Sequence, residues 1–160
     1  MALGRGTLAC VTALLLLLKV IHILAAAVAV GTNSGAVFWL RAGGRNPERI
    51  AFAIDGIRKL DRKVAIPAFG VLLLTGFLMV ALGLYDLTEG WIILAIVLYV
   101  GLAIAGMRWM GPALKRTVAE AQRDPASQAY DLAAQTSMRY TLGSLAVLVV
   151  IVVLMVTKPF

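Results

Sequence analysis

The fold of this chain is decided by its first apolar run, which extends from Leu8 to Leu40 and reads LACVTALLLLLKVIHILAAAVAVGTNSGAVFWL. At 1.5 Å per residue, a helix of this length is about 50 Å long, which exceeds the ~30 Å hydrocarbon core of a bilayer. The run therefore predicts a membrane helix that tilts, or that projects beyond the lipid at one end.

Three further apolar runs follow, and each is close to the ~20 residues that a helix needs to cross a membrane. They extend over residues 64–84, 91–110 and 138–157. None alternates apolar and polar residues as a barrel strand does, so helices are the remaining way to satisfy the backbone in lipid. The sequence predicts an all-α four-helix transmembrane bundle that forms one membrane domain over residues 1–160.

The composition agrees with a membrane protein. Hydrophobic residues make up 61% of the chain and charged residues only 14%, whereas a soluble domain carries about 25% charged residues. A net charge of +7 would suggest a nucleic-acid partner in a soluble protein. Here the basic residues flank apolar runs, so we expect the lipid bilayer as partner and no nucleic acid.

The basic residues also predict the orientation. Of the fifteen Lys and Arg residues, twelve lie between residues 41 and 63 or between residues 108 and 139. The connection at residues 85–90 has none, and it holds Asp86 and Glu89. The positive-inside rule then places the two long connections in the cytoplasm and both termini outside it. Such a distribution is typical of a multi-pass protein of the bacterial cytoplasmic (inner) membrane.

Both long connections are expected to contain amphipathic helices. Asn46-Pro47 and Asp124-Pro125 each combine a capping side chain with a proline suited to the first helical turn. After the first signal, apolar residues recur at helical spacing between basic ones, which predicts a helix lying on the membrane surface. The second signal predicts a polar helix that continues into the fourth span. Either helix would bind anionic headgroups or, alternatively, a partner protein.

The candidate functional residues share one face of the first span. Lys19 and His22 are three positions apart, and Asn33 returns to nearly the same helical angle. Ala26 and Ala29 lie between them on this stripe. An ionisable group in lipid costs about 2.5–3.5 kcal/mol, so this face is expected to meet the bundle or a cofactor. The small residues would let a helix or a planar ring approach closely.

A neutral imidazole in this position suits an axial ligand of haem iron or of another tetrapyrrole metal. We therefore take His22 as a candidate metal ligand, and Lys19 and Asn33 as candidate cofactor-binding residues, with Lys19 pairing with a propionate or another anion. The alternative is structural: His22 bonds a group on another helix while Lys19 extends toward the surface. The residues alone leave both interpretations open.

Several other kinds of site are not indicated. The predicted spans contain no Asp or Glu, which argues against a proton pump or a cation-coupled transporter. One Cys and one His make no metal cluster. Glycines at positions 70, 76, 83 and 101 predict close helix packing, and Thr75 beside Gly76 predicts a hydrogen bond between helices.

The same residues carry a family resemblance. Several short segments resemble a predicted bacterial integral membrane protein family of unknown function, DUF2269. They are Leu18–Leu24 with Gly31, the Asp61-Arg62 pair before Pro67, Thr75-Gly76, Trp91 and the closing Met155–Pro159. More distantly, Lys19-x-x-His22 resembles HemJ-type protoporphyrinogen oxidase and the copper-resistance protein D membrane domain. The HemJ resemblance implies that His22 ligates haem b with Lys19 beside it. Because the third span has no lysine and the chain no second histidine, it does not extend to the oxidase activity.

Two functions from different classes follow. The first is a non-catalytic subunit or scaffold of a larger membrane complex, which binds other membrane subunits or copies of itself and holds a tetrapyrrole such as haem b. The second is a haem b-binding membrane redox protein with His22 as axial ligand. The first is preferred, since no residue pattern supplies a substrate site independent of a cofactor, and no catalytic residue is assigned.

Overall fold

The computed structural model describes residues 5–159 and the surroundings of side chains from residue 10 onward. Over this range the chain is helical, with four rods that are long and apolar enough to cross a membrane. The first rod is α1 (Arg5–Gly43); the second is α2 (Pro47–Leu60), η1 (Asp61–Ala65) and α3 (Ile66–Ala81); the third is α4 (Gly90–Ala105), η2 (Gly106–Met110) and α5 (Gly111–Arg123); the fourth is α6 (Gln128–Thr157). The predicted four-helix transmembrane architecture is thereby confirmed.

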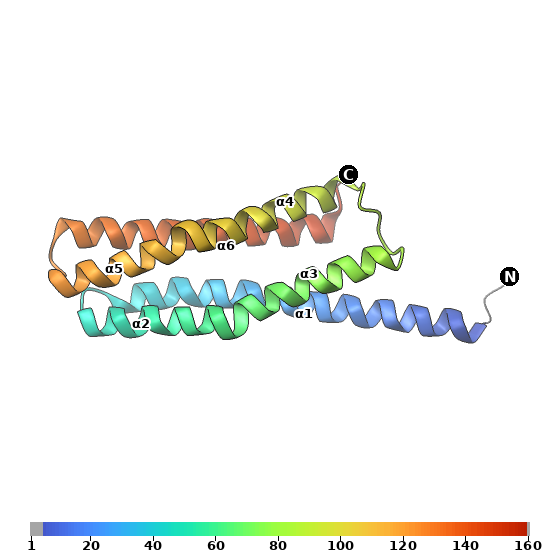
Figure 1. Cartoon of the computed structure of the whole chain (residues 1–160), viewed down its shortest axis with the longest axis horizontal. Helices are drawn as coiled ribbons and strands as arrows, with labels where there is room; N and C mark the ends of the chain where they lie inside the picture. The colour runs from blue at the N-terminus through green and yellow to red at the C-terminus, as the bar shows by residue number, and fades with distance from the viewer. Residues whose placement is uncertain (1–4, 160) are drawn as a thin grey trace.

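The four rods form two helical hairpins that lie side by side (Figure 1). In one hairpin α1 packs along α2 and α3, and in the other α6 packs along α4 and α5. The hairpins meet where α1 contacts α6 and where α2 contacts α5. Between α3 and α4, the Tyr99 hydroxyl donates to the carbonyl of Phe69 at 2.9 Å. The N-terminal end of α1 projects beyond the other helices (Figure 1).

The second and third rods each contain one π-helical turn directly before a proline. The amide of Ile66 donates to the carbonyl of Asp61, and the amide of Gly111 donates to that of Gly106. Pro67 and Pro112 follow these amides. A proline has no N–H to donate, and its ring clashes with the carbonyl four residues earlier, so a helix that continues through it must widen or bend. The prolines thus explain why the second and third rods are continuous helices that are interrupted by one wider turn.

The expected placement of the first amphipathic helix is wrong. Asn46 does cap α2, because its side chain accepts from the amides of Glu48 and Arg49 at 3.0 Å. However, α2 runs along α1 and continues through η1 into α3, so it does not lie flat on a membrane surface. Its apolar face is buried against the other rods, so this face is not available to the lipid interface.

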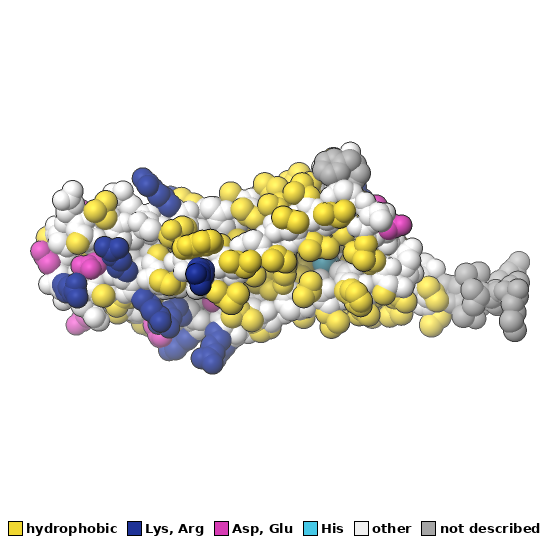
Figure 2. Space-filling view, turned by 45° about the horizontal axis from the view of Figure 1, so that its top comes forward, with side chains coloured by type: hydrophobic (Ala, Val, Ile, Leu, Met, Phe, Trp, Pro, Cys, Tyr) yellow, Lys and Arg dark blue, Asp and Glu magenta, His cyan; other side chains and the backbone are white. Residues whose placement is uncertain are grey.

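Buried apolar side chains occur along the whole bundle, and one connected hydrophobic cluster lies in the half that holds α2 and α5. This cluster joins buried residues from α1, α2, α5 and α6: Ala36, Ile50, Ile54, Ile57, Leu114, Ala121 and Tyr130. Basic side chains gather over this half, and apolar side chains cover the other (Figure 2). We call these parts the basic half and the apolar half. Residues 64–81 of the apolar half span about 27 Å, which matches a hydrocarbon core.

Candidate functional site

His22 lies on α1 in the apolar half, where α1 packs against α3. Its Nδ1 is 2.8 Å from the hydroxyl oxygen of Thr75. The hydroxyl has a single proton, which it donates to the carbonyl of Val71 at 2.6 Å, in the preceding turn of its own helix. The Thr75 oxygen must then accept from His22, so Nδ1 carries the ring proton and Nε2 has a free lone pair. The predicted inter-helix hydrogen bond of Thr75 is confirmed, and its partner is the histidine.

Gly76 allows this close approach. A Cβ atom at Gly76 would lie 3.5 Å from Cε1 and 4.0 Å from Nδ1 of His22, so the imidazole rests directly on the glycine backbone. At Gly70, Gly83 and Gly101 a Cβ atom would meet nothing within 4 Å. The expectation of close helix packing therefore holds at Gly76 and is wrong at these other glycines.

The second ring nitrogen of His22 is open to the outside of the bundle. Among the described residues, every fully buried side-chain nitrogen or oxygen has a hydrogen-bond partner. The bond of His22 to Thr75 is made by Nδ1, and Nε2 lies on the other side of the imidazole ring. The imidazole is half-buried, and the histidine colour of Figure 2 is visible between apolar side chains. A ligand would reach it from the lipid side.

Lys19, one turn from His22, extends toward the connection between α3 and α4. Its Nζ lies 6.0 Å from the centre of the Tyr85 ring, which is within the range of a cation–π contact. The side chain thus extends away from the middle of the apolar half, as the structural alternative for Lys19 expected. Lys19 and His22 thus share a helix face but have different partners, the Tyr85 ring and Thr75.

Asn33 belongs to a different contact. Ser144 of α6 donates to Oδ1 of Asn33 at 2.8 Å, and Nδ2 of Asn33 donates to the carbonyl of Ala29 at 3.4 Å. Eleven residues of helix separate Asn33 from His22, a rise of about 16 Å. The structure therefore places Asn33 between α1 and α6, where both functional groups of its amide are used, and does not bring it to the imidazole.

Sequence reasoning missed two residues at the end of the apolar half. Lys158 donates from Nζ to the hydroxyl of Tyr85 at 3.0 Å, and the Tyr85 ring meets the Trp91 ring edge-on with centres 5.4 Å apart. Partial burial opposes ionisation of Tyr85, but the hydrogen bond from Lys158 and the charges of Lys158 and Lys19 outweigh it, so the pKa of the phenol is lowered from its ordinary value. The only signal in the sequence is a lysine or an aromatic residue at each span end.

The chain belongs to a family of predicted integral membrane proteins, DUF2269. The family model matches residues 16–159. The matched region contains Lys19, His22, Thr75, Tyr85 and Lys158, so every side chain of the geometry above lies within it. Searches of the curated proteins and of the solved structures gave no match.

Proposed function

We propose that this family member is a non-catalytic subunit or scaffold of a larger membrane complex, and that it binds a tetrapyrrole through Nε2 of His22. The observation that carries this proposal is the hydrogen bond from Nδ1 of His22 to Thr75. A metal-ligating histidine characteristically donates its other ring N–H to a fixed acceptor, which sets the tautomer and the ring orientation. His22 has this acceptor already in place.

A single histidine suffices for this kind of cofactor. The four ring nitrogens of a tetrapyrrole hold the metal, so the protein must add only an axial ligand. A planar ring would approach Nε2 from the lipid side, where its apolar faces would lie against the apolar surface of the bundle. Haem b fits this description, as do other metal tetrapyrroles.

The non-catalytic role is supported by how the polar side chains of the rods are used. Asn33 binds Ser144, and Thr117 and Ser137 bind each other at 2.8 Å. These bonds join one helix to another, which is the packing role that polar residues have inside membrane proteins. The proposed partners are other membrane subunits or a second copy of the chain, in the bacterial inner membrane.

A haem b-binding redox protein is the second candidate. The observation that favours it is the open position of Nε2 at the edge of the bundle, combined with one histidine per chain. A bis-histidine haem would then need two chains or a partner subunit, and such a shared haem is suited to electron transfer. The coordination number of the haem iron distinguishes the two cases. A haem held by one chain would be five-coordinate, and a haem shared between two histidines would be six-coordinate.

The visible spectrum of the purified protein, expressed with its native neighbours, tests the proposal. His22→Ala is expected to remove the pigment without unfolding the protein, because the Thr75 hydroxyl keeps its bond to Val71. Thr75→Val removes the acceptor of Nδ1, and should weaken pigment binding by about 10–100-fold. Lys19→Met should weaken it less than His22→Ala does.

Asn33→Ala is the matched control, since Asn33 lies on the same helix but in the contact with α6. Its spectrum should equal that of the wild type. A colourless wild-type protein, or a His22→Ala variant that keeps its pigment, would refute the ligand role and leave His22 as a hydrogen-bonded residue between α1 and α3.

A further inference from the structure

Two lysines from distant parts of the chain converge on one aromatic ring at the end of the apolar half. Lys158, which follows α6, has its Nζ 4.3 Å from the centre of the Tyr85 ring and 5.7 Å from that of Trp91. Lys19, from α1, has its Nζ 6.0 Å from the Tyr85 centre. Tyr85 lies in the connection between α3 and α4, so three parts of the fold meet here.

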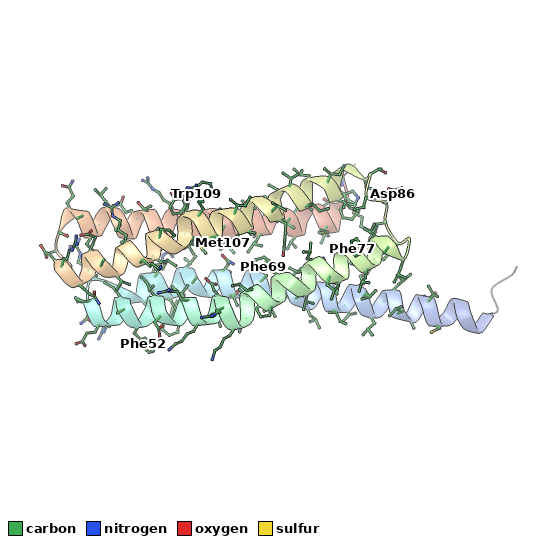
Figure 3. The ribbon with its side chains drawn as sticks, viewed as in Figure 1. Phe52, Phe69, Phe77, Asp86, Met107 and Trp109 are labelled. Carbon is green, nitrogen blue, oxygen red and sulfur yellow. The ribbon has the colours of Figure 1, made fainter. Side chains whose placement is uncertain are left out.

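The carboxylates nearest in sequence are occupied by other partners. Asp86, in the connection between α3 and α4 (Figure 3), accepts from the amide and the hydroxyl of Thr88 at 2.9 and 2.8 Å. Glu89 accepts from the indole nitrogen of Trp91 at 2.5 Å and from the amide of Asp86 at 3.1 Å. Among residues 5–159, the ion pairs within 4.0 Å involve neither lysine. Two positive charges thus lie beside one ring with no paired carboxylate from the described chain.

The backbone of Lys158 has an unusual conformation. Its φ is +44° and its ψ is 62°, the left-handed conformation that glycine normally adopts after a helix. A residue with a Cβ is strained in this conformation. The amide of Lys158 still closes the helix by donating to the carbonyl of Leu154 at 2.9 Å. A lysine here costs stability that glycine would not, which points to a use for its ammonium group.

We propose that Lys19 and Lys158, arranged around Tyr85 and Trp91, form a binding site for an oxyanion, a carboxylate or a phosphate, carried by a molecule of the membrane. The Tyr85 and Trp91 rings provide a wall of the kind found where lipid headgroups meet a protein. Each ammonium can donate to the oxyanion and keep its contact with the ring. The site does not require the tetrapyrrole of the proposed function. An anionic phospholipid headgroup and the acidic substituents of a porphyrin are two sources of the same chemistry.

Tyr85 is a built-in reporter of this site. Lys158 and Lys19 stabilise the phenolate form of Tyr85. The acidic residues Asp86 and Glu89 lie in the same connection between α3 and α4 as Tyr85. A bound anion would neutralise the lysines and repel the phenolate, so the pKa of Tyr85 must rise when the site is filled. The tyrosinate absorbance is followed against pH in the wild type and in Tyr85→Phe. The difference between the two titrations gives the titration of Tyr85 alone.

The experiment uses the full chain in nanodiscs of a zwitterionic lipid, with a short neutral extension after Phe160. Three probes are added separately: inorganic phosphate, phosphatidylglycerol, and protoporphyrin compared with its dimethyl ester. We expect at least one acidic probe to raise the apparent pKa of Tyr85, while the ester does not. The probe that acts identifies the source of the anion.

The variants Lys19→Met and Lys158→Met should abolish the response to the probe. Lys158→Gly should also abolish it while relieving the backbone strain, so a loss of response there is not a loss of folding. Lys115→Met, at an exposed lysine of α5, is the matched control and should respond as the wild type does. No shift with any acidic probe, or a shift that persists without both lysines, would overturn the proposal.

Discussion

At the residue scale, single hydrogen bonds decide what the polar side chains of the rods can do. The hydroxyl of Thr75 gives its proton to Val71, and so it leaves the imidazole of His22 as the donor. Asn33, on the same helix, is buried against α6 and has a different partner, Ser144. One bond therefore orients a potential metal ligand, whereas the other only joins two helices.

Gly44 gives a residue-scale prediction, because it connects α1 to α2 with φ +57°. Its carbonyl also accepts from the Tyr130 hydroxyl of α6. Gly44→Ala should lower the free energy of unfolding by about 1–2 kcal/mol, since an L side chain is strained in this conformation. Gly56→Ala is the control: Gly56 lies inside α2 with nothing within 4 Å of its Cβ position, so this change should stabilise by up to about 1 kcal/mol. Equal melting-temperature shifts for the two variants would contradict the assignment of the turn.

At the element scale, the second and third rods are each divided by a proline and its π-turn into a segment in the basic half and a segment in the apolar half. In the basic half, isoleucines of α2 are buried in a cluster where α2 packs against α1 and α5. In the apolar half, α1 and α3 meet where the His22 ring lies against Gly76. The prolines and their π-turns lie where each of these two rods passes from the basic half into the apolar half.

Gly76 and Gly101 provide the prediction that belongs to this scale. Gly76→Ala should be tolerated, because its Cβ would make an ordinary contact with His22. Gly76→Leu must displace the imidazole, and should destabilise the protein by about 1–3 kcal/mol. Gly101→Leu extends into open space, and should change stability by less than about 0.5 kcal/mol. Thermal unfolding in one detergent compares the three, and a Gly101→Leu variant as unstable as Gly76→Leu would show that α4 has a partner at this position.

At the scale of the whole molecule, the charge distribution along the bundle is the dominant feature. Arg45 pairs with Asp131 at 2.9 Å at the end of the basic half. The opposite end carries Lys158 and Tyr85. A bilayer around residues 64–81 leaves the basic half outside the hydrocarbon core, where its own hydrophobic cluster holds it together.

Orientation in the membrane is a prediction at this scale. With the exposed Cys10 replaced by alanine, cysteines at positions 45 and 123 should resist a membrane-impermeant thiol reagent in intact cells and react after permeabilisation. A cysteine in place of Asp86 should react in both conditions. The positive-inside rule requires this result if the basic half lies in the cytoplasm. Labelling at position 45 without labelling at position 86 would invert the orientation.

The sequence by itself determined the number of long helices, their approximate spans and the cap at Asn46, because hydropathy and capping are local properties. The second start signal, at Asp124-Pro125, was placed wrongly: Asp124 ends α5, and Ser127 caps α6. The sequence also identified His22 as a candidate metal ligand, and it predicted that Thr75 makes a hydrogen bond between helices. It did not determine that these two bond to each other, that Asn33 faces α6, or that Lys19 and Lys158 reach one ring. Each of these depends on the rotation and register of one rod against another, which are set by the packing of many side chains at once. For the same reason α2 lies along α1: its isoleucines gain more from burial in a shared core than from the membrane surface, and only the tertiary structure shows that such a core exists.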